Sequence, residues 1–299
     1  MKSFSRMAKE ELYKVENAES CCDMAEFAGL LLFGATITQQ SIRFVTENQD
    51  VLGCYVNISR RLGLEPVVKQ LSDDSVRYVA ETVDTIKIIQ LLSDLNLIHP
   101  ATGLIHYRID QGVIKKECCR RAFVKGAFLG GGTVIDPRKN YNLEIVTSHF
   151  RLSQDLHALL QQVGFPFKSV VRKSKYVLYI KNSEQISDVL TYMGAFKAQM
   201  ELLNVKIEKE SRNDFNRTAN GETANLEKTI NASVEQIKAI EKVEKYIGLD
   251  NLPDDLREIA VLRLAHKDLS MGELGSMLHP PLSKSGVNHR LRKIMRMAE

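Results

Sequence analysis

CCDMAEFAGLLLFGATI (21–37) and CCRRAFVKGAFLGGGTV (118–134) are two copies of one pattern within the same chain. Seven positions coincide without a gap at a constant offset of 97 residues. The matching pairs are Cys21/Cys118, Cys22/Cys119, Ala25/Ala122, Gly29/Gly126, Leu32/Leu129, Gly34/Gly131 and Thr36/Thr133. A repeat of about one hundred residues is too long for a solenoid unit. The pattern therefore predicts two similar halves related by a pseudo-two-fold axis.

The correspondence continues downstream of both copies. SIRFVTENQDVLGCYVNISRRLGL (41–64) parallels NLEIVTSHFRLSQDLHALLQQVGF (142–165), now at an offset of 101. The four extra residues fall near DPRKN (136–140), a turn composition in which insertions are tolerated. Each half is predicted to run from an apolar helix through a strand or hairpin, a helix and more strand to a closing helix.

Periodicity places these elements. In the first half we expect strand at 41–46, helix at 51–62, strand at 77–83 and helix at 85–92. In the second half we expect strand at 144–147, helix at 153–163, a basic hairpin at 170–180 and helix at 184–193. The predicted fold class is α+β, a duplicated α/β saddle followed by a small all-α domain.

The glycine-rich helices resemble a known family. FAGL (27–30) is similar to the start of the LAGLIDADG motif of homing endonucleases. The resemblance implies two such helices packed at the centre of a saddle whose two sheets lie on DNA. Small residues at four-residue spacing, Ala25/Gly29 and Ala122/Gly126/Gly130, would let the two backbones approach closely.

The same resemblance implies a metal-binding carboxylate at the eighth motif position, because hard cations require oxygen ligands. That position holds Gly34 in the first copy and Gly131 in the second, and glycine has no ligand atom. Asp136 has no counterpart in the first half, and Glu26 lies at the wrong end of its helix. We therefore predict a vestigial nuclease scaffold with no catalytic residues, no metal and no cofactor.

Composition is that of a globular protein without an export signal. The 299 residues carry a net charge of +4, with 44% hydrophobic and 26% charged residues. The N-terminus MKSFSRMAKEELYKVE is charged throughout, and the longest apolar run, 27–37, is about half a membrane span. We expect a cytoplasmic, nucleoid-associated protein with neither a membrane partner nor a small-molecule substrate.

Four of the five cysteines form two vicinal pairs at equivalent repeat positions, and the fifth is Cys54. Four thiolates can hold zinc. However, neighbouring cysteines are expected to splay to different sides of a helix start, and an odd count argues against a disulfide framework. We favour an interpretation as small buried core residues.

Charge differs between the two halves. Residues 65–85 contain two basic residues against five acidic ones, whereas 165–184 contain five basic residues against Glu184. Because phosphate neutralisation supplies most non-specific DNA affinity, only the second hairpin is a candidate for a weak DNA contact. Its candidate residues are Arg172, Lys173, Lys175 and Lys181.

After residue 205 the sequence becomes polar and rich in asparagine. NRTANGETANLEKT (216–229) is similar to the signature of the WhiA proteins, bacterial regulators that join a degenerate LAGLIDADG-like domain to a C-terminal helix-turn-helix. We expect a LAGLIDADG-like domain at 1–205, with repeats at about 21–110 and 118–205, then a connector at 206–232, which could include a partly exposed helix, and a helix-turn-helix domain at 233–299.

The last 70 residues predict four helices. Val234, Ile237, Ile240 and Ile247 would face the core from the first, and Leu252-Pro253-Asp254 opens the second. Ser270 and Glu273 form a capping box for a short third helix with Leu274, Met277 and Leu278 on its buried face. The succession resembles region four of bacterial sigma factors, with a turn lengthened by two prolines.

Ser283 is expected to cap the last helix, which would bury Val287, Leu291, Ile294 and Ala298. Early residues of a recognition helix usually reach bases and later ones meet phosphate. We assign Ser285, Asn288 and His289 to base readout and Arg292, Lys293 and Arg296 to phosphate. The DNA-binding set of this helix is completed by Lys284 and Arg290.

Three functions remain open on the sequence. The first is a regulator that binds double-stranded DNA, with a second regulatory protein or RNA polymerase as a further partner. The resemblance implies roles in cell division, chromosome segregation and, in spore formers, sporulation. The second is an active or nicking LAGLIDADG endonuclease, which Gly34 and Gly131 oppose. The third is a structural protein associated with the division machinery.

Overall fold

The computed structural model describes residues 3–17, 19–72, 76–99 and 101–299, and it divides the chain into two compact units, Met1–Lys209 and Glu210–Glu299. The first unit opens with α1 (Phe4–Tyr13). The first repeat consists of α2 (Ser20–Gly34), β1 (Ala35–Ile37), β2 (Ile42–Thr46), α3 (Gln49–Arg61), β3 (Val67–Ser72), β4 (Val76–Thr82) and α4 (Thr85–Asp94). The second consists of α5 (Glu117–Gly131), β5 (Gly132–Val134), β6 (Leu143–Thr147), α6 (Phe150–Gln162), β7 (Lys168–Arg172), β8 (Lys175–Ile180) and α7 (Ser183–Met193).

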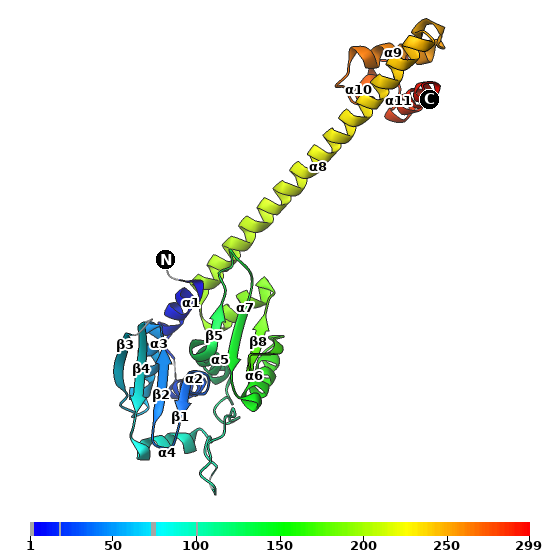
Figure 1. Ribbon diagram of the computed structural model, residues 1–299. Helices are drawn as coiled ribbons and strands as arrows, with labels where there is room; N and C mark the ends of the chain where they lie inside the picture. Colours follow the sequence, from blue (N-terminus) through cyan, green and yellow to red (C-terminus); the bar gives the residue numbers. More distant parts are fainter. Residues whose placement is uncertain (1–2, 18, 73–75, 100) are drawn as a thin grey trace. The chain divides into compact units, whose positions relative to one another are not determined.

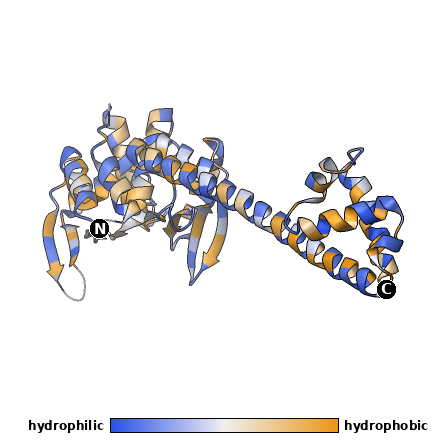
Figure 2. Cartoon of the chain, turned by 90° about the horizontal axis from the view of Figure 1, so that it is seen from above, coloured by the Kyte–Doolittle hydropathy of each residue, from blue (hydrophilic) through white to orange (hydrophobic). Residues whose placement is uncertain are grey.

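The two repeats share one topology, which confirms the predicted duplication. Each forms a four-stranded antiparallel sheet, in the order β1-β2-β4-β3 and β5-β6-β8-β7. Hydrophobic and hydrophilic residues alternate along the outer hairpins (Figure 2), as expected for sheets buried on one face. The predicted LAGLIDADG-like α+β class is correct, whereas the sequence patterns predicted neither α1 nor β3.

Helices α2 and α5 lie side by side between the two sheets (Figure 1). Their backbones touch where the small residues meet. A β-carbon at Gly29 would stand 2.6 Å from the backbone nitrogen of Ala127, and one at Gly126 would stand 2.9 Å from the carbonyl carbon of Glu26. Real β-carbons essentially never come within 3.0 Å of such atoms, so these two glycines set the distance between the helices.

One buried ion pair crosses the same interface. The Nζ atom of Lys125 lies 2.8 Å from a carboxylate oxygen of Glu26, and both side chains are almost fully buried. Asn17 donates to Glu26 at 2.6 Å, Cys54 donates at 3.4 Å, and Lys125 donates to the carbonyl of Val15 at 2.8 Å. Because every charged atom has partners, the pair is tolerated in an apolar core.

The second unit is helical. It contains the end of α8 (Phe196–Tyr246), a short 3-10 turn η1 (Leu249–Asn251), α9 (Asp254–Ala265), α10 (Met271–Ser276) and α11 (Lys284–Met297). Its core joins Ile240 and Val243 of α8 to apolar residues in and beside the other helices, namely Leu252, Leu256, Ile259, Ala260, Leu274, Leu278, Val287, Leu291, Ile294 and Ala298.

The expected connector at 206–232 lies inside α8, which is one continuous helix of 51 residues. Its few apolar residues there, Phe215, Leu226 and Ile230, are exposed. The predicted inner face farther along α8 is wrong at two positions, because Val234 and Ile247 are exposed. None of the helices among the described residues is both long and apolar enough to cross a membrane.

Polar residues replace part of that predicted inner face. Gln236 and Ser233 are buried about one and two turns before Ile240. The Ser233 hydroxyl donates to the carbonyl of Lys267 at 2.5 Å, and Gln236 donates to the sulfur of Met271 at 3.8 Å. Partners of this kind allow polar side chains to be buried where a hydrophobic pattern would place isoleucine or valine.

Candidate nucleic-acid interface

The last two helices begin at side-chain caps, as the sequence predicted. The Ser270 hydroxyl accepts from the backbone N–H of Glu273 at 3.3 Å, and the Glu273 carboxylate accepts from that of Ser270 at 2.8 Å. The side chain of Ser270 first, and its backbone N–H second, lower the pKa of Glu273 by hydrogen bonding to its carboxylate. Ser283 accepts from the N–H of Gly286 at 3.3 Å and starts α11 in the same way. The caps therefore define the residue at which each helix begins.

The turn between α10 and α11 is fixed by a close backbone approach. The carbonyl of Gly275 accepts from the N–H of Leu282 at 2.9 Å. A β-carbon at Gly275 would collide with the carbonyl of Leu282 and touch Val287 at 3.1 Å. The buried stripe of Val287, Leu291, Ile294 and Ala298 is confirmed, whereas Met277 is exposed and its predicted burial is wrong.

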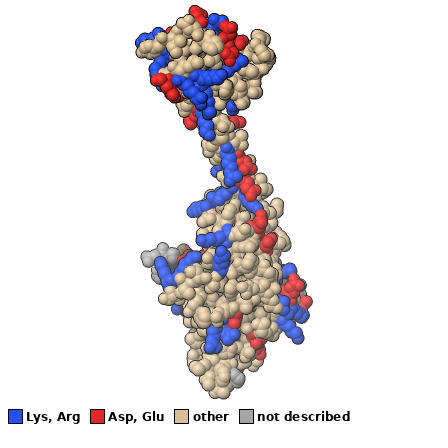
Figure 3. Space-filling view, turned by 90° about the vertical axis from the view of Figure 1, so that its right-hand side faces the viewer, with Lys and Arg blue, Asp and Glu red and all other residues tan. Residues whose placement is uncertain are grey.

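The opposite face of α11 is exposed and basic. Asn288 is half-buried, and the exposed members of the predicted set are Lys284, Ser285, His289, Arg292, Lys293 and Arg296. Among the described residues, none of the four cations on this face has a hydrogen bond or ion pair to the rest of the chain. Lys and Arg side chains gather over part of this unit (Figure 3). DNA contact by these residues remains a prediction.

Arg290 points elsewhere. Its guanidinium lies 3.6 Å from the carboxylate of Asp255 and donates to the Asp255 carbonyl at 3.3 Å, so it joins α11 to the start of α9. A second arginine, Arg263, is almost completely buried and donates to the carbonyl of Leu269 at 2.6 Å, which holds the turn before α10. Burial lowers the pKa of Arg263. Both arginines therefore stabilise the arrangement of α9, α10 and α11: Arg290 joins α11 to α9, and Arg263 holds the turn before α10.

The basic hairpin is formed by β7 and β8. Arg172, Lys173, Lys175 and Lys181 are all exposed, and Lys173 and Ser174 adopt positive φ in the two-residue turn. Arg172 of β7 pairs at 3.3 Å with Glu144 of β6, which lies on the other side of β8 in the sheet. The hairpin therefore presents its cations to solvent, and its contact with DNA also remains a prediction.

The acidic count of the first-half hairpin combines residues that lie apart. Asp73 and Asp74 fall outside the described residues, Asp84 caps α4 at 3.1 Å, and Glu65 pairs with Arg60 at 3.9 Å. Glu81 is the acid that lies on a described strand of this hairpin, where it pairs with Lys69 at 4.0 Å. Glu65 and Asp84 therefore lie outside the two strands of this hairpin.

The motif ends Gly34 and Gly131 meet at a cavity of about 480 Å³. Its described lining contains Thr147, Ser148, His149 and Lys175 but no carboxylate. A β-carbon at Gly131 would stand 2.7 Å from the carbonyl oxygen of Val146, and one at Gly34 would stand 2.5 Å from the ring of Phe44. An acidic side chain at either position would therefore displace its neighbours.

The remaining acids near the two helices have other partners. Asp136 accepts from the backbone N–H of Arg138 at 2.9 Å in its turn. Asp23 accepts from Arg61 at 2.7 Å and from Asn17 at 2.8 Å. Burial opposes ionisation of Asp23, but these bonds leave its pKa lowered. The structure brings no pair of these carboxylates together at the helix ends where the motif would place a metal.

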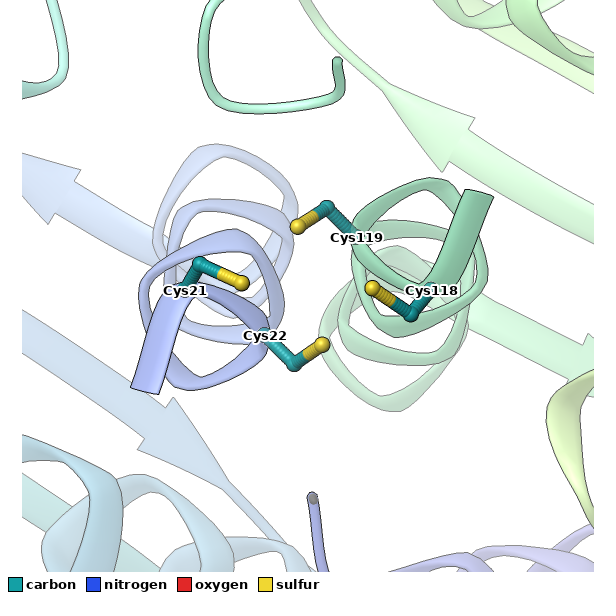
Figure 4. A group of neighbouring side chains, drawn as sticks. All are labelled: Cys21, Cys22, Cys118 and Cys119. Atoms are coloured by element: carbon teal, nitrogen blue, oxygen red, sulfur yellow. The ribbon is translucent and has the colours of Figure 1, made fainter. Parts of the chain in front are cut away.

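The opposite ends of α2 and α5 carry the two cysteine pairs. The expectation that vicinal cysteines splay apart is wrong, because the sulfurs of Cys21, Cys22, Cys118 and Cys119 all lie within 4.8 Å of one another (Figure 4). The sequence contained a signal for this cluster, because both cysteine pairs stand at equivalent positions of the repeat. A pseudo-two-fold axis brings equivalent residues together where they lie close to it.

Two family models and several relatives match the chain. The WhiA C-terminal HTH domain matches residues 215–298, and the WhiA LAGLIDADG-like domain matches residues 120–212. The chain is 38% identical over 309 residues to the "Probable cell division protein WhiA" of Alkaliphilus metalliredigens, with 99% of this chain and 98% of the relative covered. It is 41% identical over 306 residues to the protein of that name from Ruminiclostridium cellulolyticum, covering 99% and 97%.

A solved structure is similar over the same length. Full-length DUF199/WhiA from Thermatoga maritima matches with a TM-score of 0.62 and 25% identity, covering 99% of this chain and 98% of that one. The N-terminal LAGLIDADG domain of DUF199/WhiA matches with a TM-score of 0.52 over 65% of this chain. Fold order, helix-turn-helix and sequence agree over essentially the whole chain, which therefore belongs to the WhiA family.

Proposed function

We propose that the protein binds double-stranded DNA sequence-specifically through α11 and acts as a transcriptional regulator without nuclease activity. One observation carries the proposal. The exposed face of α11 bears Lys284, Arg292, Lys293 and Arg296, while the opposite face packs into the core of the second unit. A capped helix with one face packed into the core and the other face exposed and basic has the form of a recognition helix. The names of the relatives support a role in cell division.

Specificity and affinity are expected to depend on different residues of α11. Arg292→Ala should weaken binding to all sequences and reduce the slope of log K against log salt by about 1, because one phosphate contact is lost. Asn288→Ala should instead cost about 1–3 kcal/mol on the target sequence and little on random DNA. Fluorescence anisotropy across a salt series, on target and random duplexes, measures both effects. The target is first recovered by sequencing bound genomic fragments.

Arg257→Ala is the matched control, because Arg257 is an exposed arginine of the same unit that pairs with Asp254 on α9. It should leave the salt slope unchanged. Equal losses for Arg292→Ala and Arg257→Ala on every duplex, with no loss for Asn288→Ala, would show that only net charge matters. The division of α11 into base-reading and phosphate-binding residues would then be refuted.

The absence of nuclease activity rests on the crowding at Gly34 and Gly131. Supercoiled plasmid and bound target duplex incubated with Mg²⁺ or Mn²⁺ should stay intact. Gly131→Asp should not create cleavage, because its β-carbon would overlap the Val146 carbonyl. Metal-dependent cutting that persists through purification and disappears in an Asp136→Asn or Glu26→Gln variant would establish an active endonuclease instead.

A second DNA contact is proposed for the basic hairpin β7–β8. Two weak sites on one chain raise affinity through effective concentration when both reach the same DNA. Replacing Lys173 and Lys175 with Glu in the full chain should lower affinity for long target duplexes. If affinity is unchanged by this double reversal, the first unit does not bind DNA through this hairpin. The alternative role of the first unit would then be to bind another protein.

A further inference from the structure

Four thiol groups converge between the two central helices. Cys21 and Cys22 lie in the first turn of α2, and Cys118 and Cys119 lie in the first turn of α5. Their sulfurs all lie within 4.8 Å of one another and point into the space between the helices (Figure 4). Cys22 and Cys119 are buried, Cys21 is partly buried and Cys118 is exposed.

The helix interface explains this convergence. Adjacent residues of one helix point about 100° apart, so a vicinal pair on an isolated helix would diverge. Here a second helix lies at a distance set by Gly29 and Gly126, and the pseudo-two-fold axis passes between the pairs. Both cysteines of each helix therefore border the shared space, and the duplication supplies two ligands from each side.

We propose that Cys21, Cys22, Cys118 and Cys119 form a tetrathiolate site for a single zinc ion. Zinc–sulfur bonds of about 2.3 Å in a tetrahedron place the sulfurs about 3.8 Å apart. Because the four sulfurs already lie within 4.8 Å, closing the site requires each sulfur pair to approach by about 1 Å at most. An iron–sulfur cluster inserts several irons and sulfides between its cysteines, so it requires wider spacing than this.

The surroundings provide for the charge of such a site. The Nζ atom of Lys116 lies 2.7 Å from Glu19, whose carboxylate accepts from the Cys21 thiol at 3.2 Å. The ammonium group of Lys116 therefore lies beside the site, next to the carboxylate that contacts Cys21. A cavity of about 190 Å³ borders the cluster, and its lining includes Cys22, Cys118 and Arg121.

Burial is the main obstacle to thiolate formation without metal. It raises the pKa of Cys119 to about 11, and burial together with contact to Cys118 raises that of Cys22 further. The pKa of Cys118 is lowered, chiefly by its hydrogen bond to Cys22. A divalent cation removes this conflict, because it stabilises all four thiolates and releases their protons. The bound ion would link the starts of α2 and α5, and so the two halves of the first unit.

Metal content of the full-length chain tests the site. After expression with added zinc and desalting, mass spectrometry should find about one zinc per chain. Replacement by Co²⁺ should give the intense absorption bands of tetrahedral thiolate coordination. Cys118→Ser should lose zinc and these bands, and it should fold, because Cys118 is exposed. Cys54→Ser is the matched control, since Cys54 is a cysteine outside the cluster and should leave metal content unchanged.

Stability and thiol counts distinguish the alternatives. A zinc chelator should lower the melting temperature of the wild type and of Cys54→Ser but not that of Cys118→Ser. Denatured, chelated protein should show all five thiols free. Three or one free thiols would identify disulfides instead, and iron with acid-labile sulfide would identify a cluster. Either result, or wild-type protein that takes up neither Zn²⁺ nor Co²⁺, overturns the proposal whatever the variants do.

Discussion

Adding one methyl group to Gly126 tests how closely the backbones of α2 and α5 pack. The β-carbon of Gly126→Ala would stand 2.9 Å from the Glu26 carbonyl carbon and 3.1 Å from the Leu30 nitrogen, and closer still to the Glu26 oxygen. These are backbone atoms of a packed helix, which cannot move aside as a flexible side chain can. Overpacking of this kind costs about 1–3 kcal/mol, and rigid neighbours favour the upper end.

Helix propensity acts in the opposite direction. Alanine is favoured over glycine inside a helix by about 1 kcal/mol. A steric cost of about 3 kcal/mol less this gain leaves a net loss of about 2 kcal/mol for Gly126→Ala. For a domain of this size, about 2–4 °C of melting temperature corresponds to each kcal/mol, so the first unit should melt about 4–8 °C lower.

Gly221→Ala supplies the control with the same chemical change. Gly221 lies within α8, and a β-carbon there would meet nothing within 4 Å. This substitution should be neutral or stabilise by up to about 1 kcal/mol. Scanning calorimetry measures both variants and separates the transitions of the two units. The reasoning is refuted if Gly126→Ala melts no lower than wild type, or if Gly221→Ala loses as much.

Two further predictions concern buried polar groups. Glu26→Gln should lower the free energy of unfolding by about 3–5 kcal/mol, because Lys125 stays buried without its counter-charge. Glu19→Gln, which breaks the exposed pair with Lys116, should lower the free energy of unfolding far less in metal-free protein, because water screens this pair. Equal losses in urea unfolding would contradict the difference in burial. His149 stacks on Tyr107 with ring centroids 3.5 Å apart, and burial lowers its pKa. The unfolded chain therefore binds the proton more tightly, so this contribution is complete above about pH 6.5 and decreases as pH falls toward the folded pKa. His149→Phe should flatten that decrease, and an unchanged pH profile would contradict it.

The sequence predicted the features that depend on one chain segment at a time. The offset of 97 residues gave the duplication, the alternation at 42–46 gave β2, and the capping box gave the start of α10. The stripe from Val287 to Ala298 gave the buried face of α11 and hence its exposed face. Local spacing and local hydrogen bonding determine these features, so a single sequence contains them.

Features that depend on the distance between segments could not be obtained in this way. The four sulfurs meet because two helices separated by about one hundred residues touch along their glycines. Ser233 can be buried because the carbonyl of Lys267 accepts a hydrogen bond from its hydroxyl. Arg290, which the sequence assigned to DNA binding, pairs with Asp255 on another helix. In each case the partner is distant in sequence, and hydrophobic periodicity contains no information about it.

The ion pair between Glu26 and Lys125 makes the two halves of the first unit interdependent. At the repeat offset of 97, Glu26 corresponds to Phe123 and Lys125 to Ala28. Two copies of the first half, joined across the same axis, would set each Glu26 against Ala28 and bury two anions without cations. Two copies of the second half would bury two unpaired lysines beside Phe123. Each unpaired buried charge would lower the stability of such a dimer by several kcal/mol, so neither half alone is expected to form a symmetric homodimer. The duplication has become a heterodimer within one chain, whose halves must be inherited together.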